Sequence, residues 1–294
     1  MTLPNSAHYV GRFAPSPTGP LHFGSAVAAI ASYLDARAHQ GTWLVRIEDL
    51  DPPREQPGAD DLIIEALSTL GMASDLPVVY QSHRHHRYLA ALNQLQLAHQ
   101  LYPCGCTRRE IGPRAYPGTC RNGLPPGKIA RSQRFIVPSE PIEFFDASCG
   151  KHSETLSQTV GDFNLRRADG LFSYHLAVVL DDAEQGVTHV VRGRDLLSST
   201  ARQIALQNAL GYPRPSYLHF PVVCDIHGIK LSKQAFAKPL DFTSPRKVWL
   251  DALNFLKQPM ATSMKDKTLD EIMRWAIERW QPQTFASTAE PSID

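Results

Sequence analysis

The 294-residue sequence lacks the features that mark secreted, membrane-spanning and disulfide-rich proteins. Its opening residues, MTLPNSAHYV, contain no basic segment followed by an apolar run, so no secretory signal is apparent. The longest mostly apolar stretch, AVAAIASYL, is too short to cross a bilayer. Five cysteines are too few for a disulfide scaffold, and a close pair of them in a reducing compartment indicates either a metal site or no special role. We therefore expect a cytoplasmic protein with no membrane partner.

The sequence also lacks internal repeats, low-complexity tracts and a strong net charge, which is formally +1. A hydrophobic content of 43% is enough to bury a core and to build two or three structural units. The even balance conceals one basic tract between Cys104 and Arg134. It contains a single acid, Glu110, against Arg108, Arg109, Arg114, Arg121, Lys128, Arg131 and Arg134. Such a tract favours a phosphate-binding surface, and the alternative is an ordinary solvated surface.

Hydrophobic spacing predicts an α/β fold. Residues 8–13 and 42–51 are expected to be strands, and the helix between them is expected to run over 25–40, with Ser25 as N-cap and Gly41 as its stop. Strand, helix and strand in this order are typical of a parallel βαβ unit. The rest of the chain predicts helices at 60–70, 84–99 and 196–211, a loop at 103–128, and strands at 134–138, 171–182 and 188–193. The expected architecture is an open α/β sheet interrupted by an insertion.

The stretch FAPSPTGPLHFGSA, residues 13–26, joins the first strand to the first helix. Prolines and glycines shape a loop, and the unpaired N–H groups of a helix start favour an anion at the carboxyl end of a parallel sheet. Neither G-x-x-x-x-G-K-[ST] nor G-x-G-x-x-G is present, so this is not a Walker or dinucleotide loop. By themselves, the residues HFGS are also compatible with a simple turn.

HFGS, residues 22–25, resembles the HIGH signature of class I aminoacyl-tRNA synthetases and nucleotidyl transferases. The resemblance implies that His22 contacts ATP phosphates and that Gly24 lets adenine approach the backbone. Ser25 stands where the second histidine of the signature would be. We expect Ser25 in the ATP site, and we expect Lys233 to supply the phosphate contact of the missing histidine. GIKLSKQ, residues 228–234, resembles the mobile KMSKS loop. The resemblance makes His22, Lys230 and Lys233 the expected catalytic residues, and Lys233 also an expected ATP ligand.

Six segments together resemble the glutamyl branch of class I aminoacyl-tRNA synthetases: RFAPSPTGPLHFGS, LVRIEDLDPPR, QSHRHHRYLAALNQL, YPCGCTRRE, VVRGRDLLSST and KLSKQ. Only 61 residues follow Lys233, which is short for an anticodon-binding body of roughly 100 to 200 residues. The resemblance is therefore to a shortened branch that attaches glutamate to the queuosine base of tRNA(Asp). It implies a Rossmann catalytic domain in two halves (1–100 and 191–240), a zinc-containing insertion (101–190) and a short helical C-terminal segment (241–294). The implied partners are ATP with Mg²⁺, L-glutamate and queuosine-containing tRNA(Asp), and we expect a monomer.

Glutamate carries two carboxylates and an ammonium, so its pocket needs cationic forks and a carboxylate. The resemblance assigns these roles to Arg12 and Arg192, to Glu48 for the amino group, and to Tyr174 as a side-chain contact. Ala14, Pro15 and Ser16 are expected to line the same loop. The alternatives are an exposed acidic strand end for Glu48 and ordinary core packing for Tyr174.

Cys104, Cys106 and Cys120 offer three soft ligands where a structural zinc site needs four. The resemblance supplies Tyr116 as the fourth, while a water or His152 could fill the position instead. Redox chemistry and idle thiols are the other interpretations of C-x-C. The metal would be structural and would stabilise a loop-rich insertion with little core, and the adjacent arginines would face RNA.

The remaining candidates have no predicted catalytic role. The histidines of SHRHHR, residues 82–87, are expected on a solvated helix face, Cys149 and Cys224 as buried thiols, and Asp181 and Asp182 at the end of a strand. Three competing functions stay open: a glutamyl-tRNA synthetase that charges tRNA(Glu), a small-molecule nucleotidyl transferase, and a non-catalytic tRNA-binding protein.

Overall fold

The computed structural model describes residues 8–223, 240 and 242–282. Its first sheet confirms the predicted βαβ unit. Strands β1 (Val10–Phe13), β2 (Thr42–Ile47) and β3 (Val79–Tyr80) are parallel in the order β1-β2-β3, and α1 (Phe23–Ala38) connects the first two. Helix α2 (Ala59–Thr69) follows β2, as expected.

A second sheet continues the first. Its order is β7-β6-β10-β9, built from β6 (Ile142–Asp146), β7 (Gly150–Glu154), β9 (His189–Gly193) and β10 (Ser216–Phe220). Strand β10 is parallel to β9 and to β6, whereas β6 and β7 form an antiparallel hairpin. The backbone N–H of Thr188 donates to the carbonyl of Val10 at 2.9 Å, which joins the start of β9 to β1. The carboxyl ends of β1, β2, β9 and β10 therefore lie along one edge, as in an open α/β fold.

The strand predicted at 171–182 is wrong, because this segment forms helix α6 (Tyr174–Glu184). Ser173 caps the helix by accepting the N–H of Leu176 at 3.3 Å. The residues from Leu176 to Leu180 are all buried, and a short fully apolar run does not distinguish a strand from a helix. Asp181 and Asp182 consequently lie on the last helical turns rather than at a strand end.

The helices α3 (His85–Leu97) and α7 (Thr200–Leu210) lie within the predicted ranges, and Gly211 ends α7 with a left-handed φ of 73°. The residues before α7 form the 3₁₀ segment η3 (Arg194–Ser199). The predicted N-cap at Ser25 is wrong, because α1 begins at Phe23. Its N-cap is His22, whose ring Nδ1 accepts the N–H of Ser25 at 3.3 Å.

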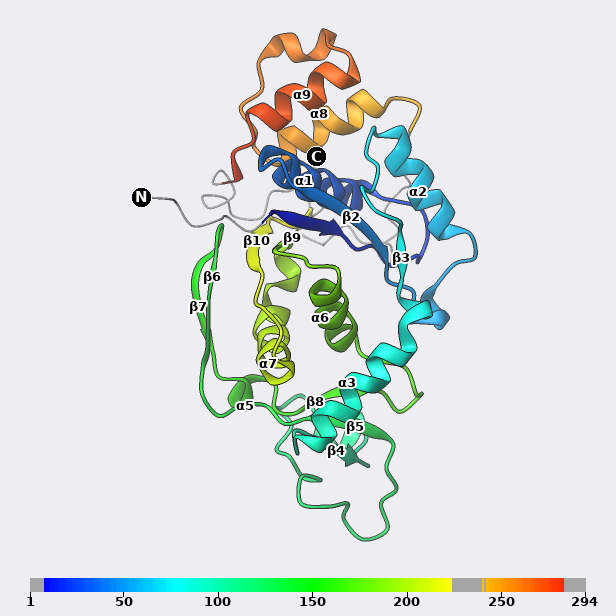
Figure 1. The fold of residues 1–294 in the computed structure, drawn as a ribbon, viewed down its shortest axis with the longest axis vertical. Coiled ribbons are helices and arrows are strands. Elements are labelled where there is room, and N and C mark those ends of the chain that lie inside the picture. Colours follow the sequence, from blue (N-terminus) through cyan, green and yellow to red (C-terminus); the bar gives the residue numbers. More distant parts are fainter. Residues whose placement is uncertain (1–7, 224–239, 241, 283–294) are drawn as a thin grey trace.

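A small antiparallel sheet lies beyond α3, in the order β4-β5-β8, from β4 (Leu101–Cys104), β5 (Ser132–Phe135) and β8 (Phe163–Arg166). The predicted loop at 103–128 contains one short helix, α4 (Arg108–Ile111), and α5 (Leu156–Thr159) precedes β8. Figure 1 shows this sheet at one end of the molecule and α8 (Pro245–Phe255) and α9 (Leu269–Glu278) over α1 at the other. Short 3₁₀ segments are η1 (Pro52–Arg54), η2 (Gln81–Arg84) and η5 (Thr262–Asp266).

Two large apolar clusters support the main sheets. One packs α1, α8 and α9 against β1 and β2, and the other packs α3, α6 and α7 against the strands beneath them. Over the described residues, no helix is both long and apolar enough to cross a membrane.

Candidate functional site

A cavity of about 460 Å³ opens at the carboxyl ends of β1, β2, β9 and β10, beside the start of α1. Every described residue predicted to bind glutamate or ATP lines it: Arg12, Ala14, Pro15, Ser16, His22, Gly24, Ser25, Glu48, Tyr174 and Arg192. These residues come from segments up to 180 positions apart, and the parallel strand order brings them together. The predicted lysines Lys230 and Lys233 lie outside the described residues.

The loop after β1 has a defined shape. The N–H of Glu48 donates to the carbonyl of Pro15 at 2.9 Å, and the N–H of Gln56 donates to that of Pro17 at 2.9 Å. Gly19 has a φ of 130°, a conformation that favours glycine over other residues. The loop is thereby fixed to β2 and to the segment after it.

Arg12 and Glu48 belong to one buried network of charges. Arg12 Nε donates to Asp182 Oδ1 at 3.1 Å. Arg46 Nη1 lies 2.8 Å from the same oxygen, and Arg46 Nη2 donates to Glu48 Oε1 at 3.2 Å. Asp182 therefore orders both the pocket arginine and, through Arg46, the pocket carboxylate.

Burial sets the electrostatics of this network. Burial raises the pKa of Glu48 above its ordinary value, although Arg46 and Arg12 oppose the shift. Burial also acts to raise the pKa of Asp182, but Arg12 and Arg46 outweigh it and hold that pKa below its ordinary value. An ammonium bound beside Glu48 would supply further positive charge and favour its ionised form.

Asp181 has its own set of donors. Gln81 Nε2 donates to it at 2.7 Å, Arg84 Nε at 2.6 Å and the Tyr88 hydroxyl at 2.8 Å. The sequence interpretation missed Asp182 as a support of the pocket and Asp181 as the centre of this second set of hydrogen bonds. The available signal was a pair of carboxylates at the end of an apolar run, since buried carboxylates require cationic or hydrogen-bonding partners.

Arg192 is 5% exposed and is held by neutral groups. Its Nε donates to His219 Nε2 at 2.9 Å, Nη1 to Gln203 Oε1 at 2.8 Å, and Nη2 to Thr200 Oγ1 at 2.9 Å. Nη1 also lies 3.5 Å from the hydroxyl of Tyr174, which connects two of the predicted glutamate ligands. Nothing in the sequence pattern pointed to His219 or Gln203.

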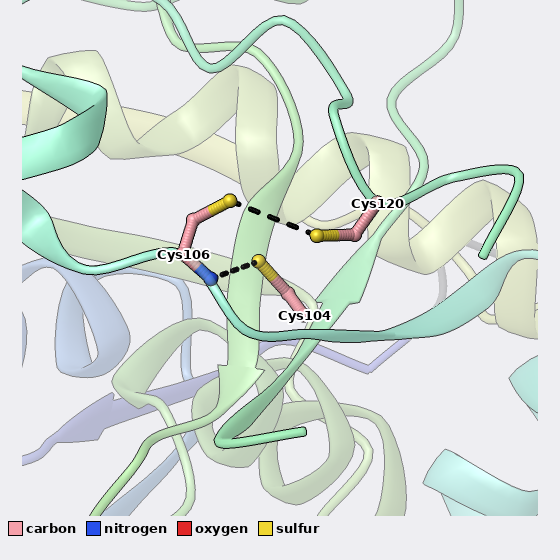
Figure 2. A group of neighbouring side chains, drawn as sticks. All are labelled: Cys104, Cys106 and Cys120. Atoms are coloured by element: carbon pink, nitrogen blue, oxygen red, sulfur yellow. Dashed lines mark hydrogen bonds between the residues drawn. The ribbon is translucent and has the colours of Figure 1, made fainter. Parts of the chain in front are cut away.

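The cysteine cluster lies at the end of β4 and in the loop that follows (Figure 2). The three Sγ atoms of Cys104, Cys106 and Cys120 lie within 4.8 Å of one another, and those of Cys106 and Cys120 are 3.6 Å apart. The Tyr116 hydroxyl lies 3.3 Å from Cys104 Sγ and 3.5 Å from Cys106 Sγ. Neighbouring ligands of a tetrahedral zinc are about 3.5–3.8 Å apart, given the usual Zn–S and Zn–O lengths. The donor set therefore fits a small tetrahedral cation, whereas His152 stacks on Phe144 in the β6–β7 hairpin.

The backbone around Tyr116 depends on a glycine. Tyr116 forms an isolated bridge with Gly161, and its N–H donates to the carbonyl of Val160 at 3.0 Å. Gly161 has a φ of 67°, and a Cβ there would lie 2.1 Å from the carbonyl oxygen of Tyr116. The phenol is thus positioned by close backbone contact.

Arg134 stabilises the cluster from inside. Its Nε donates to Cys104 Sγ at 3.2 Å, and its guanidinium lies 4.0 Å from the ring centroid of Tyr116. Burial acts to raise the pKa of the Cys104 thiol, but hydrogen bonds from Tyr116, the Cys106 N–H and Arg134 outweigh it and lower that pKa. A lowered thiol pKa favours the thiolate that a metal needs.

The basic tract therefore divides into two groups. Arg121 pairs with the fully buried Asp162, Arg134 faces the cysteines, and Lys128 pairs with Glu110. The other four members are exposed and form no ion pair with any residue that the structure describes: Arg108, Arg109, Arg114 and Arg131.

The remaining candidates agree in part with expectation. His83, His85 and His86 are exposed, as predicted for a solvated face. Cys149 is half-buried rather than fully buried, and Cys224 lies outside the described residues.

Residues 9–114 and 128–264 match the family model described as tRNA synthetases class I (E and Q), catalytic domain. The chain belongs to the class I glutamyl- and glutaminyl-tRNA synthetase family. This confirms the resemblance on which the predicted fold class rested.

Several curated members of the family are similar to this chain over most of their length. It is 50% identical to a glutamyl-Q tRNA(Asp) synthetase of Aromatoleum aromaticum, over 92% of this chain and 89% of the relative. It is 53% identical to the protein of that name from Burkholderia orbicola, over 92% and 96%. Identity to the Cupriavidus metallidurans protein of the same name is 51%, over 94% and 92%.

Solved structures agree with this membership of the class I synthetases. A glutamate tRNA ligase from Elizabethkingia meningosepticum, in complex with its amino acid, superimposes with a TM-score of 0.81 at 26% identity, covering 97% of this chain and 67% of the ligase. The glutamate-tRNA synthetase of Elizabethkingia anophelis gives 0.80 at 26% identity, covering 96% and 68%. The α/β class I catalytic fold predicted from the sequence is thus confirmed.

Proposed function

We propose that this protein activates L-glutamate with ATP and transfers it to the queuosine base in the anticodon loop of tRNA(Asp). The observation that carries the proposal is the gathering of Arg12, Glu48 and Arg192 around one cavity of about 460 Å³ beside the start of α1. Two buried guanidinium groups and a buried carboxylate are complementary to a dicarboxylic amino acid. The names of relatives at about 50% identity supply the acceptor, queuosine-containing tRNA(Asp).

In this proposal, glutamate binds through its charges. Arg12 and Arg192 bind the two carboxylates, Glu48 binds the ammonium, and Tyr174 contacts the side chain. The loop residues Ala14, Pro15 and Ser16 complete the wall. The network behind Arg12 and Glu48 is formed before substrate arrives, so little ordering remains to be done on binding.

ATP, as its magnesium complex, is proposed to bind at the start of α1, where the unpaired N–H groups favour phosphate. His22 contacts the phosphates, Gly24 admits adenine and Ser25 lines the same site. Lys230 and Lys233 complete it, and Lys233 supplies the phosphate contact that Ser25 lacks. An α-carboxylate oxygen of glutamate attacks the α-phosphorus, the bond to the β-phosphate oxygen breaks, and pyrophosphate leaves. Positioning and charge stabilisation supply most of the catalysis.

In the second step, a hydroxyl of the queuosine cyclopentenediol attacks the glutamyl carbonyl. An ester forms, the mixed anhydride breaks, and AMP leaves with the hydroxyl proton passing to solvent. The exposed arginines Arg108, Arg109, Arg114 and Arg131 are proposed to contact RNA phosphates.

We assign the cysteine cluster to a structural Zn²⁺. Thiolates of Cys104, Cys106 and Cys120 and the oxygen of Tyr116 would hold it, and the ion would cross-link the loop between β4 and β5. Residues 1–100 and 191–240 are the proposed catalytic halves, 101–190 the insertion and 241–294 the helical C-terminal segment. We further propose that the protein acts in the cytoplasm as a monomer.

The test is ATP-dependent incorporation of labelled glutamate into purified tRNA. Label confined to queuosine-containing tRNA(Asp), and absent from the same tRNA without queuosine, is the expected result. Label on tRNA(Glu) would instead make this a conventional glutamyl-tRNA synthetase, a reading that the likeness to two solved synthetases keeps open. Nucleotide transfer without RNA would favour the nucleotidyl transferase, and absence of ATP turnover the binding protein.

A further inference from the structure

Arg192 differs from the other pocket arginine in what surrounds it. Across the described part of the chain, no carboxylate lies within ion-pair distance of Arg192, whereas Arg12 pairs with Asp182 at 3.1 Å. The contacts of Arg192 are to the neutral groups of His219, Gln203 and Thr200. Among the described residues, its positive charge is therefore not offset by a carboxylate and is available to an anionic ligand.

The contact with His219 defines the state of that ring. Arg192 Nε can only donate, so His219 Nε2 must accept, and the ring proton must lie on Nδ1. His219 Nδ1 is 2.6 Å from Asp146 Oδ2, which accepts this proton. Burial lowers the pKa of His219, and Asp146 opposes the shift. A neutral ring bonded on both sides results.

Asp146 is itself held in place by burial and by hydrogen bonds from the backbone. Asp146 and His219 are both fully buried. The N–H groups of Ser148 and Cys149 donate to Asp146 Oδ1 at 3.0 Å and 2.8 Å. Strands β9 and β10 pair in parallel with His219 opposite Arg192, so the two side chains leave the sheet on the same side. The series of hydrogen bonds from Asp146 through His219 to Arg192 thus spans three adjacent strands. All three side chains are held by regular strands, so the series does not depend on the ordering of a loop.

We propose that His219, oriented by Asp146, is a positioning residue that fixes the guanidinium of Arg192 for a carboxylate of glutamate. The inference rests on the proposed function, because it takes glutamate as the ligand of this pocket. A neutral acceptor orients the guanidinium and leaves its positive charge in place. A carboxylate in the same position would neutralise that charge. Protonation of the ring would set two donors against each other and release Arg192.

The experiment uses the full chain and two assays: calorimetric binding of L-glutamate and glutamate-dependent exchange of pyrophosphate into ATP. His219→Leu removes the acceptor, and His219→Gln can return an amide oxygen to the position of Nε2. We expect His219→Leu to weaken glutamate binding and raise its KM by about 10- to 100-fold, as for loss of a hydrogen bond to a charged group. The KM for ATP should stay within about two-fold, and His219→Gln should recover most of the loss.

His189→Leu is the matched control, since His189 begins the same strand β9 and stacks on Tyr9 with ring centroids 4.0 Å apart. It should leave the KM for glutamate unchanged. A His219→Leu protein with wild-type glutamate affinity overturns the inference, as does an equal rise in both KM values. If His219→Leu fails to fold, the comparison is between His219→Gln and the wild type. A folded His219→Gln protein that has lost glutamate binding then overturns the inference as well.

A pH profile separates positioning from a merely structural role. The charged or titratable groups facing His219 are Asp146 on β6, His152 on β7, Arg192 on β9 and Tyr217 on β10. Glutamate affinity of the wild type should fall on the acid side of the ordinary histidine pKa of about 6.5, as the ring gains a proton. His219→Gln should lack that acid limb, and an unchanged limb counts against the inference. Wild-type protein that neither binds nor activates glutamate would instead overturn the proposed function, and the inference with it.

Discussion

The substrate pocket and the cysteine cluster are stabilised in opposite ways. The pocket lies between two large apolar clusters, and its charged groups are paired or hydrogen-bonded by residues of regular strands and helices. The cluster has a core of only four buried residues, Tyr102, Cys104, Tyr116 and Cys120. So small a core supplies little hydrophobic stabilisation, and a bound metal is the obvious substitute. We therefore expect the pocket to form when the chain folds, without a ligand, and the cysteine cluster to form when a metal binds.

The strongest test of the first half of this comparison is Asp182→Asn. Removing the carboxylate leaves Arg12 and Arg46 without their shared partner, and a broken buried pair costs about 3–5 kcal/mol. Denaturant unfolding should report that loss, and glutamate-dependent pyrophosphate exchange should fall with it. Asp169→Asn is the control, because its pair with Arg167 is largely exposed and is worth at most about 1 kcal/mol. Equal stability of the two variants would contradict the assigned role of Asp182.

The same residue predicts a pH dependence. The pKa of Asp182 is held below its ordinary value in the folded protein, so its contribution is complete above the unfolded pKa of about 3.9. It is lost as the pH falls from there through the lower folded value. Unfolding curves recorded between neutral and acid pH should show this loss in the wild type and less of it in Asp182→Asn.

Metal removal tests the second half. Chelation, or Cys104→Ser, should release one equivalent of metal and lower glutamate transfer to tRNA by about ten-fold or more, because metal binding and local folding are coupled. Pyrophosphate exchange should change by less than about two-fold, since the pocket does not depend on the cluster. Elemental analysis and the two assays measure this. Cys149→Ser, outside the cluster, should keep its metal. Parallel loss of exchange and transfer would show that the two regions are coupled.

A glycine pair sharpens the comparison. Gly161 and Gly186 both have a φ of 67°, but a Cβ at Gly161 would meet the carbonyl of Tyr116 at 2.1 Å while one at Gly186 would meet nothing within 4 Å. Gly186→Ala should therefore cost only the conformational penalty of about 1–2 kcal/mol. Gly161→Ala should cost more and lower metal occupancy, as measured by thermal unfolding and elemental analysis. Matching effects in both variants would argue that the contact with Tyr116 is unimportant.

The smallest effect is expected at the exposed arginines. Arg114→Ala should weaken tRNA binding only a few-fold, with a shallower salt dependence and unchanged stability, because one phosphate contact is lost. Arg121→Ala should instead lower stability, since it leaves the buried Asp162 short of a partner. Filter binding at several salt concentrations and unfolding curves distinguish the two. A large stability loss for Arg114→Ala would contradict the division of the basic tract.

The resemblance to the glutamyl branch predicted the residues that line the pocket, and the parallel strand order explains why most of them meet at one edge of the sheet. The partners behind them were not predicted. Asp182 supports Arg12 across 170 positions and His219 supports Arg192 across 27, and no local pattern encodes either contact. The apolar run before Asp181 was also predicted to be a strand although it forms a helix, because buried strands and buried helices share such runs. The roles of Lys230 and Lys233 stay predictions, since both lie outside the described residues.

The N-cap of α1 couples the order of the first helical turn to the binding of a negatively charged ligand. Because His22 Nδ1 accepts the N–H of Ser25, the neutral ring carries its proton on Nε2, the nitrogen that can donate to a phosphate oxygen. One ring would then serve the helix through one atom and the nucleotide through the other. A stronger hydrogen bond at one ring nitrogen limits the movement of the ring and so favours the hydrogen bond at the other nitrogen. Nucleotide binding and fraying of the first turn of α1 are therefore linked equilibria. Amide hydrogens in the first turn of α1 should exchange more slowly with solvent when ATP is bound.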